Sequence, residues 1–172
     1  TPILRAIHWN RLETAKLIYE ADNETMTAED SSGYTAMHWA VLAVNDDEDG
    51  AEVDRLPLVQ WIFDLCPQLL MSEDESGKTP IHIACEFGAK LEVVQWFFTT
   101  NSDTIDAVDE DGWTVAHFAA ERDREDILEV VLQLQPSLYD AVDSEDKTPL
   151  VVAQIENKAV VLEYLENWKS AN

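Results

Sequence analysis

Apolar residues recur at helical spacing in pairs of short segments along this chain, and the pairs repeat. The first segments share one phrase, which reads TPILRA from Thr1, TAMHWA from Thr35, TPIHIA from Thr79, TVAHFA from Thr114 and TPLVVA from Thr148. Their threonines are 34, 44, 35 and 34 residues apart. A second apolar segment follows each phrase, as RLETAKLIY, RLPLVQWIF, KLEVVQWFF, REDILEVVL and KAVVLEYLE. The pattern therefore predicts five units of two short helices each.

A turn signal precedes four of the five phrases, in the form DSSGYT, DESGKT, DEDGWT and DSEDKT. Aspartate bonds the backbone two residues further on, and glycine adopts positive φ without steric cost, so this pair favours a tight turn. In the last unit Asp146 takes the place of glycine, which predicts a weaker turn. Pro67 and Pro136 are expected just beyond the second helix of their units, because proline cannot continue a helix.

These phrases resemble the ankyrin repeat family, whose unit of about 33 residues combines a turn and two helices with a T-P-L-H-x-A phrase. The resemblance covers essentially the whole chain. It implies an all-α repeat protein, an α-solenoid of stacked helix-turn-helix units with projecting hairpin-like fingers. The implied single domain is 1–172, with repeats at approximately 1–28, 29–72, 73–107, 108–141 and 142–172. The first helices and the fingers are then expected to line a concave face, and alanines are expected where neighbouring units pack closely.

The composition indicates which classes of partner the chain can bind. The chain has 172 residues, 46% of them hydrophobic, which is enough for one globular core. Its 11 Lys and Arg against 35 Asp and Glu leave a net charge of −24. Direct binding of nucleic acid or of an anionic membrane surface is therefore disfavoured, and a cationic partner is favoured. No apolar run approaches the ~20 residues that span a membrane, so membrane insertion is not expected.

Two cysteines, Cys66 and Cys85, form no metal or disulfide pattern, which favours a reducing compartment, cytoplasmic or nuclear. The first repeat phrase begins at Thr1, with no turn before it. We therefore expect the chain to be part of a complex or of a larger polypeptide.

The candidates for chemistry are few. His38, His82 and His117 share the fourth place of the phrase and are interpreted as structural, each bonding the backbone of a turn. A ten-residue insertion, 45–54, reads NDDEDGAEVD and matches the first half of an EF-hand calcium loop, but Leu56 stands where that loop needs a glutamate. No catalytic phrase or phosphate-binding glycine loop occurs. The sequence therefore predicts no enzyme, no cofactor and no metal residue, with weak calcium binding by the insertion as an alternative.

Charge is segregated within the repeat. Basic residues recur where each second helix is predicted to begin, at Arg11, Arg55, Lys90, Arg124 and Lys158. Acids concentrate on the fingers, which are expected to form one negative ridge.

The resemblance also implies where a partner binds, namely at the fingertips and at the two residues after each repeat phrase. Large aromatic residues at such positions are typical of binding hot spots, and acids around them steer a cationic partner. The expected function is a non-catalytic protein-protein interaction module whose acidic concave face binds a basic protein segment. The predicted partner-binding residues are Trp9, Tyr34, Glu75, Lys78, Phe87, Glu110, Asp111, Trp113, Glu121, Arg122 and Glu145.

Two alternatives stay open for this surface. Tyr34 and Trp113 could merely cover neighbouring fingers, with the charge maintaining solubility. The chain could also be a structural subunit held permanently in an assembly through its convex side, where Trp61, Trp96 and Tyr164 recur, although that row is interpreted as packing between helices.

Overall fold

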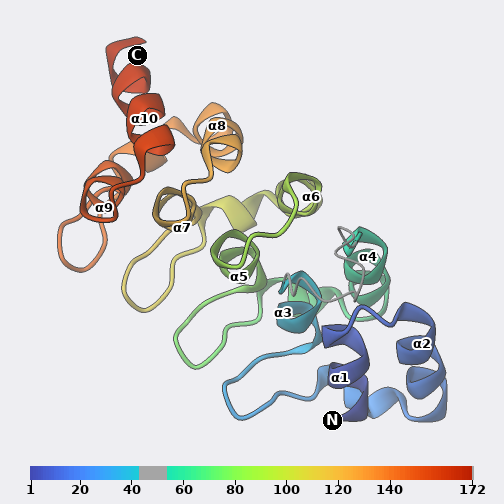
Figure 1. Ribbon diagram of the computed structural model, residues 1–172. Coiled ribbons are helices and arrows are strands. Elements are labelled where there is room, and N and C mark those ends of the chain that lie inside the picture. The colour runs from blue at the N-terminus through green and yellow to red at the C-terminus, as the bar shows by residue number, and fades with distance from the viewer. Residues whose placement is uncertain (43–53, 172) are drawn as a thin grey trace.

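The computed structural model describes residues 1–42 and 54–171, which form an elongated stack of helix pairs (Figure 1). Within these ranges there are ten α-helices in two layers and no strand, only an isolated bridge between Val108 and Thr114. The inner layer is α1 (Pro2–His8), α3 (Ala36–Val41), α5 (Pro80–Glu86), α7 (Val115–Glu121) and α9 (Pro149–Ile155). The outer layer is α2 (Leu12–Ala21), α4 (Leu56–Leu65), α6 (Leu91–Thr100), α8 (Glu125–Leu134) and α10 (Ala159–Ala171). The predicted all-α fold class is confirmed.

Each of the first four outer helices is followed by a 3-10 helix that the sequence pattern did not reveal. These are η1 (Asn23–Thr27), η2 (Pro67–Met71), η3 (Ser102–Asp106) and η4 (Pro136–Tyr139). Pro67 and Pro136 stand just beyond α4 and α8, as predicted, and each begins a 3-10 helix.

Four finger loops connect these 3-10 helices to the next inner helices, at 28–35, 72–79, 107–114 and 140–148, here called the first to fourth finger loops. They project side by side from one edge of the stack (Figure 1).

One hydrophobic core runs through all the helix pairs. Inner helices contact inner helices, from α1 with α3 to α7 with α9, and outer helices contact outer helices, as α6 does with α8. Ala116, Ala119 and Ala120 on α7 are fully buried. Their small side chains let the adjacent helices approach closely, as the sequence indicated. The repeat boundaries themselves stay predictions.

The repeat phrase begins the inner helices and also ties neighbouring units together. In α3, α5 and α7 the phrase threonine donates its backbone N–H to Nδ1 of the phrase histidine, over 3.1, 3.1 and 3.2 Å. Nδ1 therefore accepts, so the ring proton lies on Nε2. Nε2 of His38, His82 and His117 donates to the carbonyls of Lys78, Ala107 and Lys147 in the next finger loops, each over 3.0 Å. The structural interpretation of these histidines is confirmed.

Hydrogen bonds within and between the finger loops fix their geometry. In each loop one aspartate carboxylate accepts two backbone N–H groups, as Asp74 does from Ser76 at 2.7 Å and from Lys78 at 3.0 Å. Neighbouring tips are joined directly, because Glu75 N–H donates to the Ser32 carbonyl over 3.1 Å. The same contact joins the third loop to the second and the fourth to the third. The loops therefore form one continuous wall.

Glycine at the tips of the first and second finger loops is required by the loop that follows each one. Gly33 has a φ of +77°, and a Cβ there would lie 2.9 Å from the backbone nitrogen of Glu75. Gly77 meets the backbone nitrogen of Glu110 at the same distance. Asp146 has a φ of +60° in the fourth loop, the last finger loop among the described residues. The fourth-loop turn, predicted to be weaker, keeps its backbone hydrogen bonds. The Asp143 N–H donates to the Lys147 carbonyl over 3.0 Å.

Alanine substitutions at two glycines can measure separately the destabilisation caused by positive φ and that caused by a clash with the neighbouring loop. Gly88 has the same φ as Gly33, +77°, but nothing lies within 4 Å of its added Cβ. Gly88→Ala is expected to destabilise the fold by ~1–2 kcal/mol through the left-handed backbone alone. Gly33→Ala is expected to cost ~1–3 kcal/mol more, because the adjacent backbone must move. Urea unfolding of both variants measures the difference, and equal losses would contradict the contact between loops.

Because three histidines are buried, we expect the folded state to lose stability in acid. Burial is the main cause that lowers the pKa of His82 from its ordinary 6.5 to about 4, and it also lowers the pKa values of His38 and His117. Between pH 6.5 and about pH 4, the unfolded chain binds more protons at His82 than the folded chain does. The stability of the folded state therefore falls as the pH falls. We expect His82 alone to account for a loss of about 2 kcal/mol between pH 7 and pH 4.5.

The measurement is urea unfolding at both pH values, with His82→Gln as the non-titrating comparison. The variant is less stable at pH 7 but is expected to lose less on acidification. An identical pH dependence in the two proteins would show that His82 does not titrate as its burial predicts.

Candidate functional site

Along α1, α3 and α5, the inner helices and the first two finger loops form the walls of a groove. The structure distributes the eleven predicted partner-binding residues over the finger loops and the ends of the inner helices. Tyr34 lies on the first loop, Glu75 and Lys78 on the second, Glu110, Asp111 and Trp113 on the third, and Glu145 on the fourth. Trp9 and Phe87 cap the C-terminal ends of α1 and α5, and they are 44% and 42% exposed. Glu121 and Arg122 lie at the end of α7.

A hollow of about 450 Å³ lies between the first and second finger loops, and it brings together four of these residues, Tyr34, Glu75, Lys78 and Phe87. Tyr34 is half-buried and stacks on the His38 ring at 5.2 Å. Phe87 enters from the end of α5. The remaining lining residues are Asp30, Ser32, Trp39, Asp74, Ser76 and Glu86.

A second hollow, of about 340 Å³, adjoins the first and shares Asp30 and Trp39 with it. His8 lines this hollow, with its ring 5.1 Å from the Trp9 ring and 4.8 Å from the Trp39 ring. Thr1, Leu4 and Arg5 complete the lining. The two hollows form one aromatic stretch of the groove beside α1, α3 and α5.

Trp39 is the lining residue that sequence reasoning missed. It holds the fifth place of the repeat phrase, where the other units after the first have Ile83, Phe118 and Val152. Its indole N–H donates to Asp30 Oδ2 over 3.0 Å, and its ring is only half-buried. The available signal was size, because tryptophan is the largest residue at that place in any unit.

Carboxylates surround the phenol of Tyr34. Burial is the main cause that raises the pKa of Tyr34 to about 12, and the negative charges of Asp74, Glu86 and Asp30 raise it further. The hydroxyl is therefore neutral at physiological pH and the local potential is negative, so a cation entering this hollow meets favourable electrostatics.

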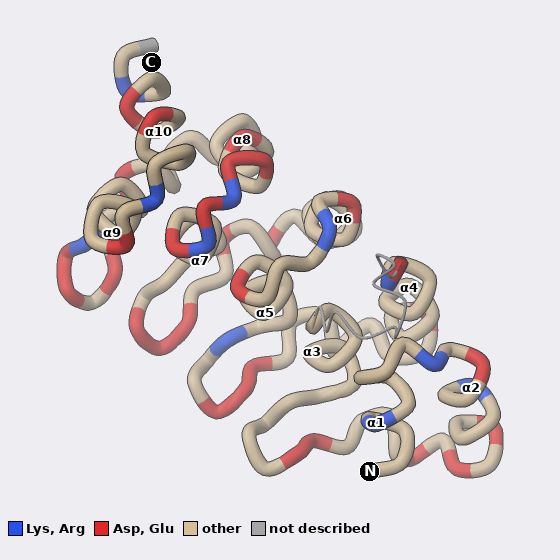
Figure 2. Tube along the Cα trace, viewed as in Figure 1, with Lys and Arg blue, Asp and Glu red and all other residues tan. Residues whose placement is uncertain are grey.

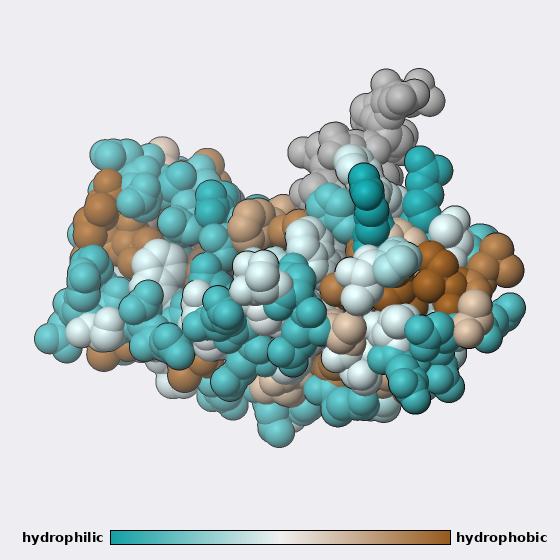
Figure 3. All heavy atoms as spheres, turned by 90° about the horizontal axis from the view of Figure 1, so that it is seen from below, coloured by the Kyte–Doolittle hydropathy of each residue, from teal (hydrophilic) through white to brown (hydrophobic). Residues whose placement is uncertain are grey.

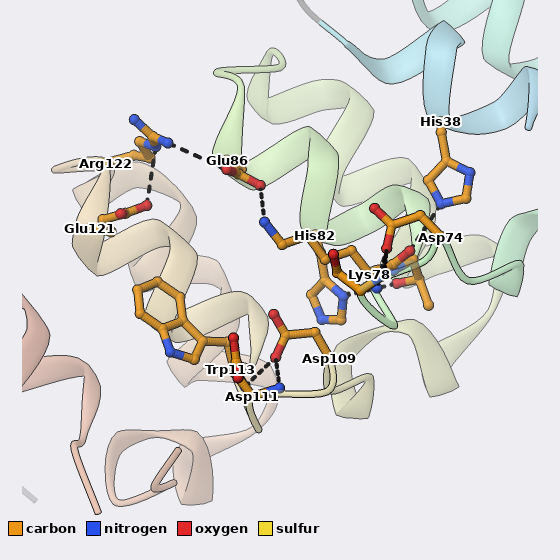
Figure 4. A network of polar contacts seen from close by, with 12 residues as sticks. His38, Asp74, Lys78, His82, Glu86, Asp109, Asp111, Trp113, Glu121 and Arg122 are labelled. Carbon is orange, nitrogen blue, oxygen red and sulfur yellow. Dashed lines mark hydrogen bonds and ion pairs between the residues drawn. The ribbon is translucent and has the colours of Figure 1, made fainter. Parts of the chain in front are cut away.

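The predicted residues Lys78, Glu121 and Arg122 belong to one ionic network, joined by Glu86 (Figure 4). Glu86 binds Lys78 Nζ at 2.7 Å and Arg122 Nη2 at 3.5 Å. Arg122 Nε also contacts Glu121 at 3.3 Å. Lys78 Nζ lies 5.0 Å from the centre of the Phe118 ring, a cation-π distance. Two cations balance two carboxylates, so the network itself carries no net charge.

Trp113 bridges two finger loops. Its indole N–H donates to Asp143 Oδ2 on the fourth loop over 3.2 Å, and its ring lies 5.1 Å from the Phe118 ring. It is half-buried, so part of its area already stabilises the stack. Glu110, Asp111 and Glu145 are exposed at the tips, where Glu145 pairs with Lys147. None of these four residues lines either hollow.

Acidic residues mark all four finger loops, whereas basic residues recur at the starts of the outer helices (Figure 2). Two of these basic residues are tied into the stack. Arg55 is 6% exposed and donates to the His8 carbonyl over 3.0 Å. Arg124 donates to the Ala89 carbonyl over 3.0 Å and pairs with Asp126 at 2.7 Å. They bind the preceding helix pair, so they offer little positive charge to a partner.

Seen from below the view of Figure 1, the surface is mostly hydrophilic, with hydrophobic residues gathered in patches (Figure 3). No helix within residues 1–42 and 54–171 has the length and apolar content to cross a membrane. In the same ranges, no three His, Cys, Asp or Glu side chains gather in a way that suits a metal ion. The calcium half-site predicted at Asn45, Asp47, Asp49 and Gly50 lies outside the described residues, and Leu56 is the first residue of α4.

Two comparisons with known proteins bear on this geometry. A family model described as ankyrin repeats, in three copies, matches residues 49–140, which is more than half of the chain. A search of curated proteins found no match.

The ionic network gives a measurable coupling. Lys78 and Glu86 side chains are 23% and 15% exposed, so their pair is screened less than one at the surface. A double-mutant cycle with Lys78→Met and Glu86→Gln, followed by urea unfolding, is expected to give ~1 kcal/mol of coupling. The cycle of Lys16 and Glu13, whose side chains are 38% and 83% exposed, serves as control and is expected to give ~0.3 kcal/mol. Equal couplings would contradict the importance of partial burial.

Proposed function

The chain belongs to the ankyrin repeat family, whose repeats mediate protein-protein interaction, and from this premise we propose that it binds a basic segment of another protein. The segment lies along the groove between the finger loops and the inner helices, and the module performs no catalysis. The observation that carries the proposal is the pair of adjoining hollows, with aromatic walls and a rim of carboxylates.

The aromatic residues supply the affinity. Trp9 and Phe87 are each more than 40% exposed, so much of each ring takes no part in packing the helices. A partner that covers them removes apolar area from water, at ~25 cal/mol per Å². Tyr34 and Trp39 add half-buried rings between them. Clustered aromatic residues of this kind are the side chains that dominate binding energy at interfaces.

The net negative charge of the chain selects for cationic partners and increases the rate at which they associate. With a net charge of −24, the chain attracts cations at long range and repels anionic partners. The carboxylates of Asp74 and Glu75 lie at the rim of the first hollow, where they meet a basic segment at contact distance. The buried free thiols of Cys66 and Cys85 suit a reducing compartment, and we place the interaction in the cytoplasm or nucleus.

The alternative of a permanent structural subunit receives less support. It requires free aromatic residues on the outer helices, but Trp61 lies edge-on to Tyr19 at 6.0 Å and Trp96 edge-on to Phe63 at 5.4 Å. These rings are engaged in packing between adjacent outer helices. The groove offers the better docking surface.

Capture from lysate by the immobilised chain tests the proposal, with captured proteins identified by mass spectrometry. Phe87→Ala is expected to lose most specific partners, because an exposed aromatic anchor is removed. Leu17→Ala is the matched control, since Leu17 is 67% exposed on the outer helix α2 and lies away from the groove. Raising the salt from 50 to 500 mM is expected to release the same partners, since screening weakens charge contacts.

Circular dichroism checks that both variants fold. Capture that Phe87→Ala leaves unchanged, or that Leu17→Ala reduces equally, would reject the groove as the binding surface. Capture that 500 mM salt leaves unchanged would reject a basic partner.

A further inference from the structure

Resting on the proposed function, we propose that the hollow between the first and second finger loops is a specificity site that receives one arginine side chain of the bound segment. The hollow of about 450 Å³ has room for a long side chain together with water. Its chemistry is defined by three aromatic rings, four carboxylates and a single cation of its own.

The aromatic rings provide faces for a flat cation. Tyr34 and Trp39 lie on one side, with ring centres 5.5 Å apart and planes at 65°, and Phe87 comes from the end of α5. The guanidinium group is planar and more weakly hydrated than an ammonium group, so it stacks on such faces at a smaller desolvation cost. The geometry favours arginine over lysine.

Carboxylates outnumber cations in the lining. Asp30, Asp74, Glu75 and Glu86 line the hollow, against one cation, Lys78. Glu86 pairs with Lys78, while Asp30 and Asp74 accept backbone N–H groups of their own loops. Glu75 is exposed, and the lining keeps an excess of negative charge. The five N–H donors of a guanidinium form a rigid fork that reaches more than one acceptor at once. Burial is the main cause that raises the pKa of Tyr34, and the charges of Asp74, Glu86 and Asp30 raise it further, which agrees with a negative potential here.

The chain itself shows how this surface holds a cation. Lys78 Nζ is placed between a carboxylate, Glu86 at 2.7 Å, and an aromatic ring, Phe118 at 5.0 Å. The same hollow also holds a second carboxylate, Glu75, and a second ring, Phe87. In the hollow both partners are available to another molecule, since Glu75 is exposed and Phe87 is 42% exposed.

Titration of the ¹⁵N-labelled chain with N-acetyl-arginine N-methylamide, followed by NMR, tests the assignment directly. The indole N–H of Trp39 reports on the hollow, and its cross-peak is identified by its loss in Trp39→Phe. We expect saturable shifts of this peak and of the Ser32 and Ser76 amides. The lysine analogue is expected to bind several-fold more weakly. The citrulline analogue, which matches arginine in shape without its charge, is expected to cause no saturable shift.

Matched variants separate a site from a general negative field. Glu75→Gln is expected to weaken arginine binding several-fold, whereas Glu145→Gln removes the same charge from an exposed position on the fourth loop and is expected to have no effect. Equal responses to arginine and lysine, or to arginine and citrulline, would overturn the proposal. So would equal losses in the two glutamine variants.

The outcomes also distinguish this site from the wider proposal. If arginine fails to shift Trp39 but salt-sensitive capture still requires Phe87, the arginine assignment is wrong and the binding groove remains. If capture also ignores Phe87, both are wrong.

Discussion

The stack depends on satisfying the backbone polar groups of four loops that are neither helix nor sheet. Such groups are costly to bury without partners. Here an aspartate carboxylate satisfies two N–H groups inside each loop, and a neighbouring loop supplies a carbonyl, as Ser32 does for Glu75. A buried histidine on the preceding inner helix then donates to the next loop, as His38 does to Lys78. Adjacent units are therefore coupled by hydrogen bonds as well as by the apolar core.

This coupling explains how loops can form a recognition surface. Exposed loops usually move more than the elements they connect, but here each tip is bonded to the next and anchored from below. The hollows consequently have a fixed wall on the loop side and a helical wall on the other. Aromatic residues such as Trp39 and Phe87 then vary the chemistry of the groove without altering its framework, and an ordered site of this kind saves the entropy cost of assembling it on binding.

Local patterns predicted what depends on local chemistry. The repeated phrase gave the helix pairs, the role of His82 and the tight turn at Gly77, because each follows from a few neighbouring residues. The pattern did not reveal Trp39 as a groove residue, Arg55 and Arg124 as links to the preceding pair, or Glu86 as the centre of an ionic network. These depend on which side chains meet across units, and contacts between units leave no signature in the spacing of one phrase. Of the eleven predicted partner-binding residues, Tyr34, Glu75, Lys78 and Phe87 share one hollow, while their role in binding stays a prediction.

The glycines at the first and second fingertips also give the array a direction. A side chain at Gly33 or Gly77 is excluded by the loop that comes next, whereas Asp146 occupies the corresponding place in the fourth loop with no such neighbour in this chain. Units are thus not freely interchangeable: recombination that put the Asp146 unit in the place of the Gly33 or Gly77 unit would create a collision, but a unit carrying glycine could take the fourth place. Modular rearrangement of such an array is therefore permitted in one order and penalised in the other.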